Sequence, residues 1–324
     1  MIRAFQTGFA AVVLAAAGLL APGPASAQYP LRPVRIIVPN EAGGVYDLVG
    51  RLLAGELSKR LGQSVFVENR PGGGSVTGTL AAATAAPDGH TLLMGGLSNI
   101  AFNPGVYEKL PYDPIRDFVP VGLAYTFPYV MVARGGLPQS SVAQIIEAAR
   151  RTPDSFSIGS PGRGSAPQVL GAALMKSAGV RFVEIPYKGT QAQYTDLLAG
   201  RIDLMFSSES AALPHIATGK IKGIAIAGPR RSSRAPDLPT MAESGMPGLE
   251  MEAWLGLFAP AATSPDIVER LRDELRVSIP ALKERFAASG GEPMQLTRAE
   301  TDAFVRKELE RWMAVIREAG IRAD

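Results

Sequence analysis

The stretch VRIIVPNEAGGVYD, residues 34–47, combines a buried-strand pattern with the start of a helix. Its first five residues form an apolar run that predicts a strand. A helix is predicted over 47–61, ending at Gly62, with one side formed by Leu48, Leu52, Leu53, Leu57 and Leu61. The adjacent glycines Gly43 and Gly44 therefore lie between a strand and a helix, where unpaired backbone N–H groups can hold an anion.

The same alternation continues along the chain. After helix 47–61, strands are predicted at 64–67, 91–94, 127–132, 156–158, 182–185, 202–206 and 224–227, and helices at 77–86, 142–150, 167–178 and 191–199. Strands joined by helices predict two α/β units with parallel sheets. The last third predicts helices that begin at Ser264 and, with a capping box, at Thr297.

A second glycine-rich loop, GSPGRGS at 159–165, also lies between a strand and a helix. Each unit thus offers one small-residue loop at the carboxyl end of a strand, the edge where open α/β sheets bind ligands. The helix macrodipole favours an anion at both loops. We interpret them as two parts of one ligand site, and plain backbone turns remain the alternative. The glycines at 72–74 lack dinucleotide-binding spacing and are interpreted as a turn.

The first 27 residues have the pattern of a secretory signal peptide cut after Ala27, with Arg3 followed by an apolar run and then Pro22. The run is shorter than the ~20 residues of a membrane span. Removing Arg3 leaves 33 − 1 = 32 basic against 30 acidic residues, a formal charge of +2, which gives no basic footprint for nucleic acid. Without cysteine there are no disulfides, so an exported chain of this size fits the bacterial periplasm.

Few residues suit catalysis. The chain has only His90 and His215, no zinc-ligand spacing, and no Gly-x-Ser-x-Gly elbow around Ser160. Asp47 and Asp203 could form a carboxylate pair, but Asp47 at a helix start is interpreted as structural or ligand-orienting. We therefore predict no catalytic residue, no metal and no cofactor. The alternative is an exported α/β hydrolase-like enzyme that acts on a carboxylate or ester through a loop serine and an Asp base.

The sequence resembles the tripartite tricarboxylate transporter substrate-binding proteins, also called Bug receptors, over essentially the whole mature chain. The segments that carry the resemblance include RPV (32–34), AGG (42–44) with Asp47, VENRPG (67–72), PDG (87–89), LPYDP (110–114), PYKG (186–189), LPT (238–240) and WLGL (254–257). The resemblance implies an α/β, two-lobed periplasmic binding protein, type II-like, with two chain crossings and a ligand cleft. It assigns lobe 1 to 28–127 and 251–324 and lobe 2 to 128–250.

The resemblance also implies a function. The protein would capture a small organic or aromatic acid for the membrane subunits of a tripartite tricarboxylate-type transporter. A receptor that signals to a sensor kinase is a separate alternative. Low aromatic content and the lack of a heptad predict a monomer. The ligand-binding residues that it implies, with two serines added because they would face the cleft, are Ala42, Gly43, Gly44, Tyr46, Asp47, Ser98, Ser160, Gly162, Gly164, Ser165 and Ser207.

Departures from the family pattern lie where specificity should be set. Asn40 and Glu41 follow the strand's proline, where the family usually has an aromatic and then small residues, and Tyr46 stands where a small hydroxyl residue is common. Glu41 would repel a second carboxylate if it faced the cleft, or would point to water. Tyr46 is expected to stack on an aromatic ring or to hydrogen-bond a polar group of the ligand.

Overall fold

The computed structural model describes residues 29–162, 164–187 and 189–322, so the predicted signal peptide lies outside the described residues. The chain divides after Leu31, and the unit that begins at Arg32 contains all the helices and strands named below. In the described part of the chain, no helix has the length and apolar character that a membrane crossing requires.

The part of the chain that begins at Arg32 contains two α/β units. The first α/β unit is built around β1 (Val34–Val38), whose side chains are mostly buried. It pairs in parallel with β2 (Val65–Asn69) and β3 (Thr91–Gly96), and α2 (Val45–Leu61) and α3 (Val76–Ala83) make the connections. These predicted strands and helices are confirmed. Leu48 is 42% exposed, however, so it does not belong to the buried side of α2, where Val49 is buried instead.

The second unit is built around β5 (Ser157–Ser160), which pairs in parallel with β6 (Val183–Pro186) and β7 (Leu204–Ser208). Its helices are α5 (Val142–Arg151), α6 (Ala166–Ala178), α7 (Thr190–Leu198) and α8 (Glu209–Ala217). A core of buried residues from β4, α7, β7 and β8 includes Val130, Leu197, Met205 and Ile226.

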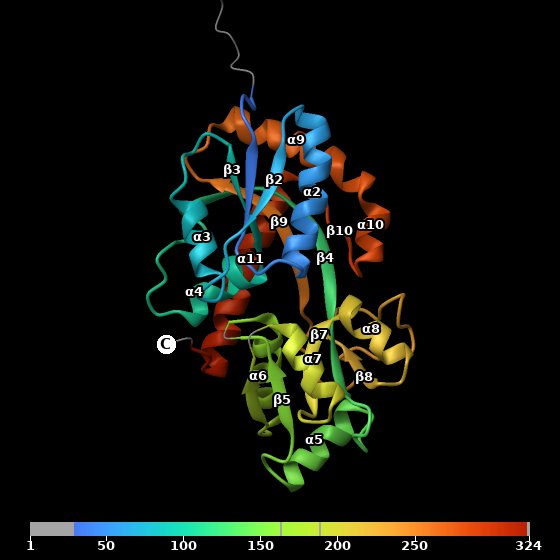
Figure 1. Cartoon of the computed structure of the whole chain (residues 1–324). Coiled ribbons are helices and arrows are strands. Elements are labelled where there is room, and N and C mark those ends of the chain that lie inside the picture. The colour runs from blue at the N-terminus through green and yellow to red at the C-terminus, as the bar shows by residue number, and fades with distance from the viewer. Residues whose placement is uncertain (1–28, 163, 188, 323–324) are drawn as a thin grey trace, which may run out of the picture. The chain divides into compact units, whose positions relative to one another are not determined.

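One long strand, β4 (Phe118–Arg134), belongs to both units (Figure 1). Its first part pairs with β9 (Glu252–Pro260) and with β10 (Glu292–Pro293), and its last part pairs with β7 and β8 (Ile221–Ile226), always antiparallel. The strand order is β2-β1-β3-β9-β4-β7-β5-β6. The predicted parallel pairing is confirmed within each unit, but the sheet as a whole is mixed, because β4 and β9 add antiparallel pairs. Because β4 runs into the second unit and β9 runs back, these neighbours pair antiparallel without a crossover helix.

The C-terminal helices pack on the first unit. They are α9 (Pro265–Ala281), α10 (Lys283–Ala288) and α11 (Arg298–Ala319), and α11 contacts two short elements, η2 (Leu97–Phe102) and α4 (Asn103–Val106). The rings of Phe102 and Trp312 meet edge to face at 5.3 Å. Glu308 accepts hydrogen bonds from the indoles of Trp254 and Trp312. The capping box predicted at Thr297 is confirmed.

Candidate ligand-binding site

Asp47 fixes the first glycine loop. This carboxylate is only 5% exposed, and Oδ2 accepts the Gly43 amide at 2.9 Å and Arg51 Nε at 3.0 Å. Burial alone would raise the pKa of the Asp47 carboxyl, but the hydrogen bonds from Arg51 and Gly43 outweigh it and lower the pKa. The carboxylate therefore orients the loop. Its hydrogen-bond partners, the Gly43 amide and Arg51, lie in the loop before α2 and in the first turns of that helix.

The loop brings the start of α2 to the surface. Ala42, Gly43 and Gly44 are exposed, and Gly43 has a φ of +86°, which favours glycine. Gly44 is the N-cap of α2 and has no side chain with which to cap the first turn. The N–H groups of that turn have no partner within the helix, so an anion can accept their hydrogen bonds.

Tyr46 turns its hydroxyl toward the chain segment that follows β3. It is hydrogen-bonded to the side chain and the backbone of Ser98, and burial raises its pKa to about 12. The hydroxyl also lies 2.5 Å from where a Cβ would stand on Gly96, so only glycine fits there. The predicted residues Tyr46 and Ser98 are thus brought together, and the phenol stays protonated at neutral pH.

The second glycine loop is held by its own hydrogen bonds. Ser160 is 3% exposed, and its hydroxyl donates to Glu184 Oε1 at 3.0 Å, an atom that also accepts from Gln168 Nε2. Gly164 donates its amide to Gln168 Oε1 at 2.8 Å. Ser165 caps α6, because its hydroxyl oxygen accepts a hydrogen bond from the backbone N–H of Gln168. The same hydroxyl donates to Gly162 O. The two loops therefore differ, because α6 is capped by a side chain and α2 is not.

This second loop lies against the first unit. A Cβ on Gly164 would stand 3.5 Å from both Asn103 Oδ1 and Val106 in α4. Asn103 is fully buried; its Nδ2 donates to Gly74 O and to the Tyr112 hydroxyl, and its Oδ1 has no hydrogen-bond partner among the described residues. Sequence reasoning missed Asn103, because a lone asparagine before Pro104 shows only a turn signal.

Ser207 is buried beside the crossing strand. It pairs in register with Val130 of β4, and its hydroxyl accepts from the Tyr194 hydroxyl at 2.7 Å. His215 packs its ring on Tyr194 with the centroids 4.9 Å apart. Burial raises the pKa of Tyr194 to about 12, so this hydroxyl is a protonated donor. The Ser207 hydroxyl thus accepts a hydrogen bond from Tyr194 within its own unit, and this contact is consistent with a structural role.

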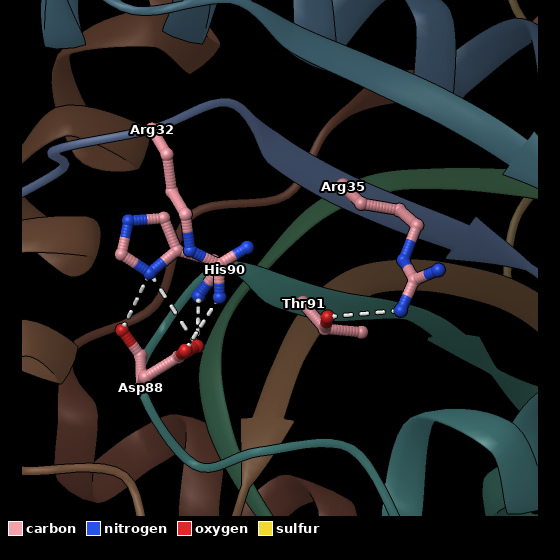
Figure 2. A network of polar contacts seen from close by, with 5 residues as sticks. All are labelled: Arg32, Arg35, Asp88, His90 and Thr91. Atoms are coloured by element: carbon pink, nitrogen blue, oxygen red, sulfur yellow. Dashed lines mark hydrogen bonds and ion pairs between the residues drawn. The ribbon is translucent and has the colours of Figure 1, made fainter.

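The other histidine and the second aspartate lie away from the glycine loops. Figure 2 shows His90 beside Asp88, with Arg32 on the same carboxylate and Arg35 bonded to Thr91. These contacts lie where β3 begins, whereas the first glycine loop follows the other end of β1.

Asp203 accepts from Arg134 and from Ser157 at the start of β5, beside a cavity of about 400 Å³. Asp47 and Asp203 each pair with their own arginine, Arg51 and Arg134, and this agrees with the structural or ligand-orienting interpretation of Asp47 over a carboxylate pair. Among the described residues, no cluster of three or more histidine, aspartate or glutamate side chains could hold a metal ion.

Comparison with known proteins assigns the chain to a family. A family model described as a tripartite tricarboxylate transporter family receptor matches residues 49–321. The chain belongs to this family. BugT of Bordetella pertussis is 35% identical over 314 residues, which cover 96% of this chain and 96% of BugT.

Three solved structures have the same fold. The periplasmic binding protein BugD is 34% identical with a TM-score of 0.82, covering 91% of this chain and all of BugD. MatC from Rhodopseudomonas palustris, solved with bound malate, is 32% identical with a TM-score of 0.81, covering 89% of this chain and 100% of MatC. An R. palustris protein solved with adipate is 31% identical with a TM-score of 0.82, covering 90% and 98%. The protein is a two-lobed solute-binding receptor of this family.

Proposed function

We propose that this receptor works in the periplasm, where it captures a small carboxylate and delivers it to the membrane subunits of a tripartite tricarboxylate-type transporter. The family description supports the transporter partner, and two structural neighbours with dicarboxylate ligands support the ligand class. The observation that carries the proposal is the uncapped start of α2, held open by Asp47. A monomer is sufficient for this function.

The ligand carboxylate binds at the first turn of α2, and the second loop covers it. Backbone N–H groups and the helix dipole stabilise its charge without a lysine. Because the second loop already uses the Gly164 amide and the Ser165 hydroxyl, it contributes shape more than donors. The proposed contact residues are those predicted from sequence: Ala42, Gly43, Gly44, Tyr46, Asp47, Ser98, Ser160, Gly162, Gly164, Ser165 and Ser207.

The two lobes are proposed to comprise 28–127 with 251–324, and 128–250. The change of pairing partners along β4 supports a crossing near Phe127, and β9 supports the return. A ligand that contacts both lobes stabilises the closed arrangement by its difference in affinity for the closed and open states. The transporter then recognises the closed receptor.

The hydrolase alternative requires an activated loop serine. Among the described residues, Ser160 donates to the Glu184 carboxylate and not to the Asp base that this alternative invokes, and Ser165 caps a helix, so the alternative would have to use Ser160 with Glu184. Nucleophilic catalysis needs such a base within hydrogen-bond reach. The alternative predicts turnover of the acid or ester, whereas the receptor predicts binding without chemical change.

A thermal-shift screen of the chain from Gln28 tests the proposal. The panel contains mono-, di- and tricarboxylates, aromatic acids and amino acids, each paired with its uncharged amide, with mass spectrometry of every hit after incubation. An acid at 100 times its Kd should add about 2.7 kcal/mol of stability, while its amide should add far less. Stabilisation by amides as strong as by acids, or recovery of altered compounds, would contradict the proposal.

A further inference from the structure

Gln193 in α7 carries a buried side-chain amide that has no hydrogen-bond partner among the described residues. The residue is 0% exposed, and neither Nε2 nor Oε1 makes a hydrogen bond within the described chain. Burying an amide in this way costs free energy unless some other group supplies the missing hydrogen bonds. The side-chain atoms Nε2 and Oε1 of Gln193 could therefore form hydrogen bonds with a bound molecule.

Gln193 lies at the same sheet edge as the second glycine loop. Its helix begins just after β6, whose last residue, Pro186, pairs in register with Ser160. The Gln193 Cγ stands 3.6 Å from where a Cβ on Gly159 would lie, directly before Ser160. The next residue, Tyr194, donates to Ser207. Gln193 is thus connected to two residues of the proposed site, to Ser160 through the neighbouring Gly159 and to Ser207 through Tyr194.

The two unpaired atoms define the chemistry of their partner. Nε2 carries two N–H donors, and Oε1 is an acceptor that needs an O–H or N–H donor. An ionised carboxylate offers acceptors only, so it can satisfy Nε2 but not Oε1. A hydroxyl group can donate to Oε1 and accept from Nε2 at once.

We propose that Gln193 is a specificity-determining residue that hydrogen-bonds a hydroxyl of the ligand, which makes this receptor selective for hydroxycarboxylates over their deoxy analogues. The inference rests on the proposed function, because the ligand carboxylate is taken to bind at α2. A site built to bond a ligand hydroxyl rejects the analogue without it, since the buried amide is then left unpaired.

Matched acids that differ by one hydroxyl test this directly. Affinities for malate and succinate, lactate and propionate, and mandelate and phenylacetate are measured by calorimetry for the wild type, Gln193→Met and Gln191→Met. Methionine keeps the volume of glutamine and removes its hydrogen bonds. Gln191 is the matched control, because it is an exposed glutamine in the same helix. Gln193→Leu is a second apolar variant if Gln193→Met melts below the wild type.

We expect the wild type to bind the hydroxy member of its tightest pair at least about tenfold more tightly, which is 1.4 kcal/mol. Gln193→Met should reduce that ratio to about threefold or less, and Gln191→Met should keep it. An unchanged ratio in both Gln193 variants, or a wild type that prefers the deoxy acid, would overturn the inference while the carboxylate function stands. If no carboxylate binds the wild type, the proposed function fails and this inference falls with it.

Discussion

At the scale of single residues, Asp47 shows how a buried charge can fix the loop that forms a site. Its carboxylate is bonded to the Gly43 amide and to Arg51, which fixes the backbone of the exposed loop. The loop then needs no rearrangement to present the first turn of α2. Preorganisation of this kind lowers the cost of ordering the site when a ligand binds.

Asp47→Asn should destabilise the receptor by about 1–3 kcal/mol at pH 7 and weaken acid binding, because a buried charged partner of Arg51 is lost. The folded pKa of Asp47 is lowered, so its stabilisation is complete above the ordinary pKa of 3.8 and disappears as the pH falls through the folded value. Urea unfolding at pH 7 and pH 3 measures this. Exposed Asp237→Asn is the control, and a difference from wild type that does not shrink at pH 3 would contradict the prediction.

Tyr46 tests whether the first loop sets specificity. Its hydroxyl is bonded to Ser98, so the ring edge and face are the parts left for a ligand. Tyr46→Thr should lower affinity for aromatic acids more than for aliphatic acids of the same charge, since the stacking surface is removed. Calorimetry with one acid of each kind measures the ratio, and an unchanged ratio would argue against the expected role of Tyr46.

At the scale of elements, the two helices that begin at the glycine loops differ in their caps. Ser165 caps α6 as Ser141 caps α5, each accepting the amide of the third residue that follows. The start of α2 has glycine at this position instead. An uncapped start leaves donors for a ligand, whereas a capped start mainly fixes the loop before it.

Ser165→Ala and Ser141→Ala should each cost about 1 kcal/mol of stability, the usual value of a lost N-cap. Only Ser165→Ala should also weaken acid binding, because the hydroxyl that holds Gly162 lies in the second glycine loop. Paired denaturation and calorimetry separate the two effects. Equal losses of affinity in both variants would show that the loop makes no specific contribution.

The sequence predicts most elements but not how they are joined. Regular apolar patterns identify β1, β5, α6 and α11, and the capping box locates Thr297. The sequence does not predict the short elements η2 and α4, because elements of this length are too short to show a periodic pattern of apolar residues. The antiparallel pairing of β4 with β9 depends on contacts between distant segments, which local patterns do not contain.

Some residues of the candidate site can be predicted from the local sequence, and others only from the packing of distant segments. The glycines at 43–44 are predictable because a strand, a turn and a helix follow one another in sequence. Gln193 is not, since a glutamine inside a helix is usually exposed, as Gln191 is. Only the packing of α7 on β5 shows that its amide is buried and unpaired.

At the scale of the whole molecule, β4 and β9 link the two α/β units. Glu252 at the start of β9 lies opposite Pro128 of β4. Burial raises the pKa of its carboxyl, and the nearby Glu292 and Glu308 add to this, while Arg230 and Thr126 oppose it. The crossing therefore carries a carboxylate whose charged form is disfavoured in the folded protein.

Glu252→Gln should raise the melting temperature at pH 7 and leave it unchanged at pH 4. Below the ordinary pKa of 4.5 the carboxyl is largely protonated in both states; as pH rises toward the raised folded pKa, the unfolded state ionises first and folding loses stability. Differential scanning calorimetry at both pH values tests this. Exposed Glu310→Gln is the control, and a gain at pH 4 equal to that at pH 7 would refute the prediction.

Backbone amide chemical shifts of the ¹⁵N-labelled receptor test the central claim most directly, that a carboxylate is held at the two glycine loops. On saturation with the tightest-binding acid, the largest shift changes should fall on the amides of 43–47 and 160–165. Shift changes centred on Arg134, Leu137 and Asp203, around the cavity at the other end of β5, would contradict the account.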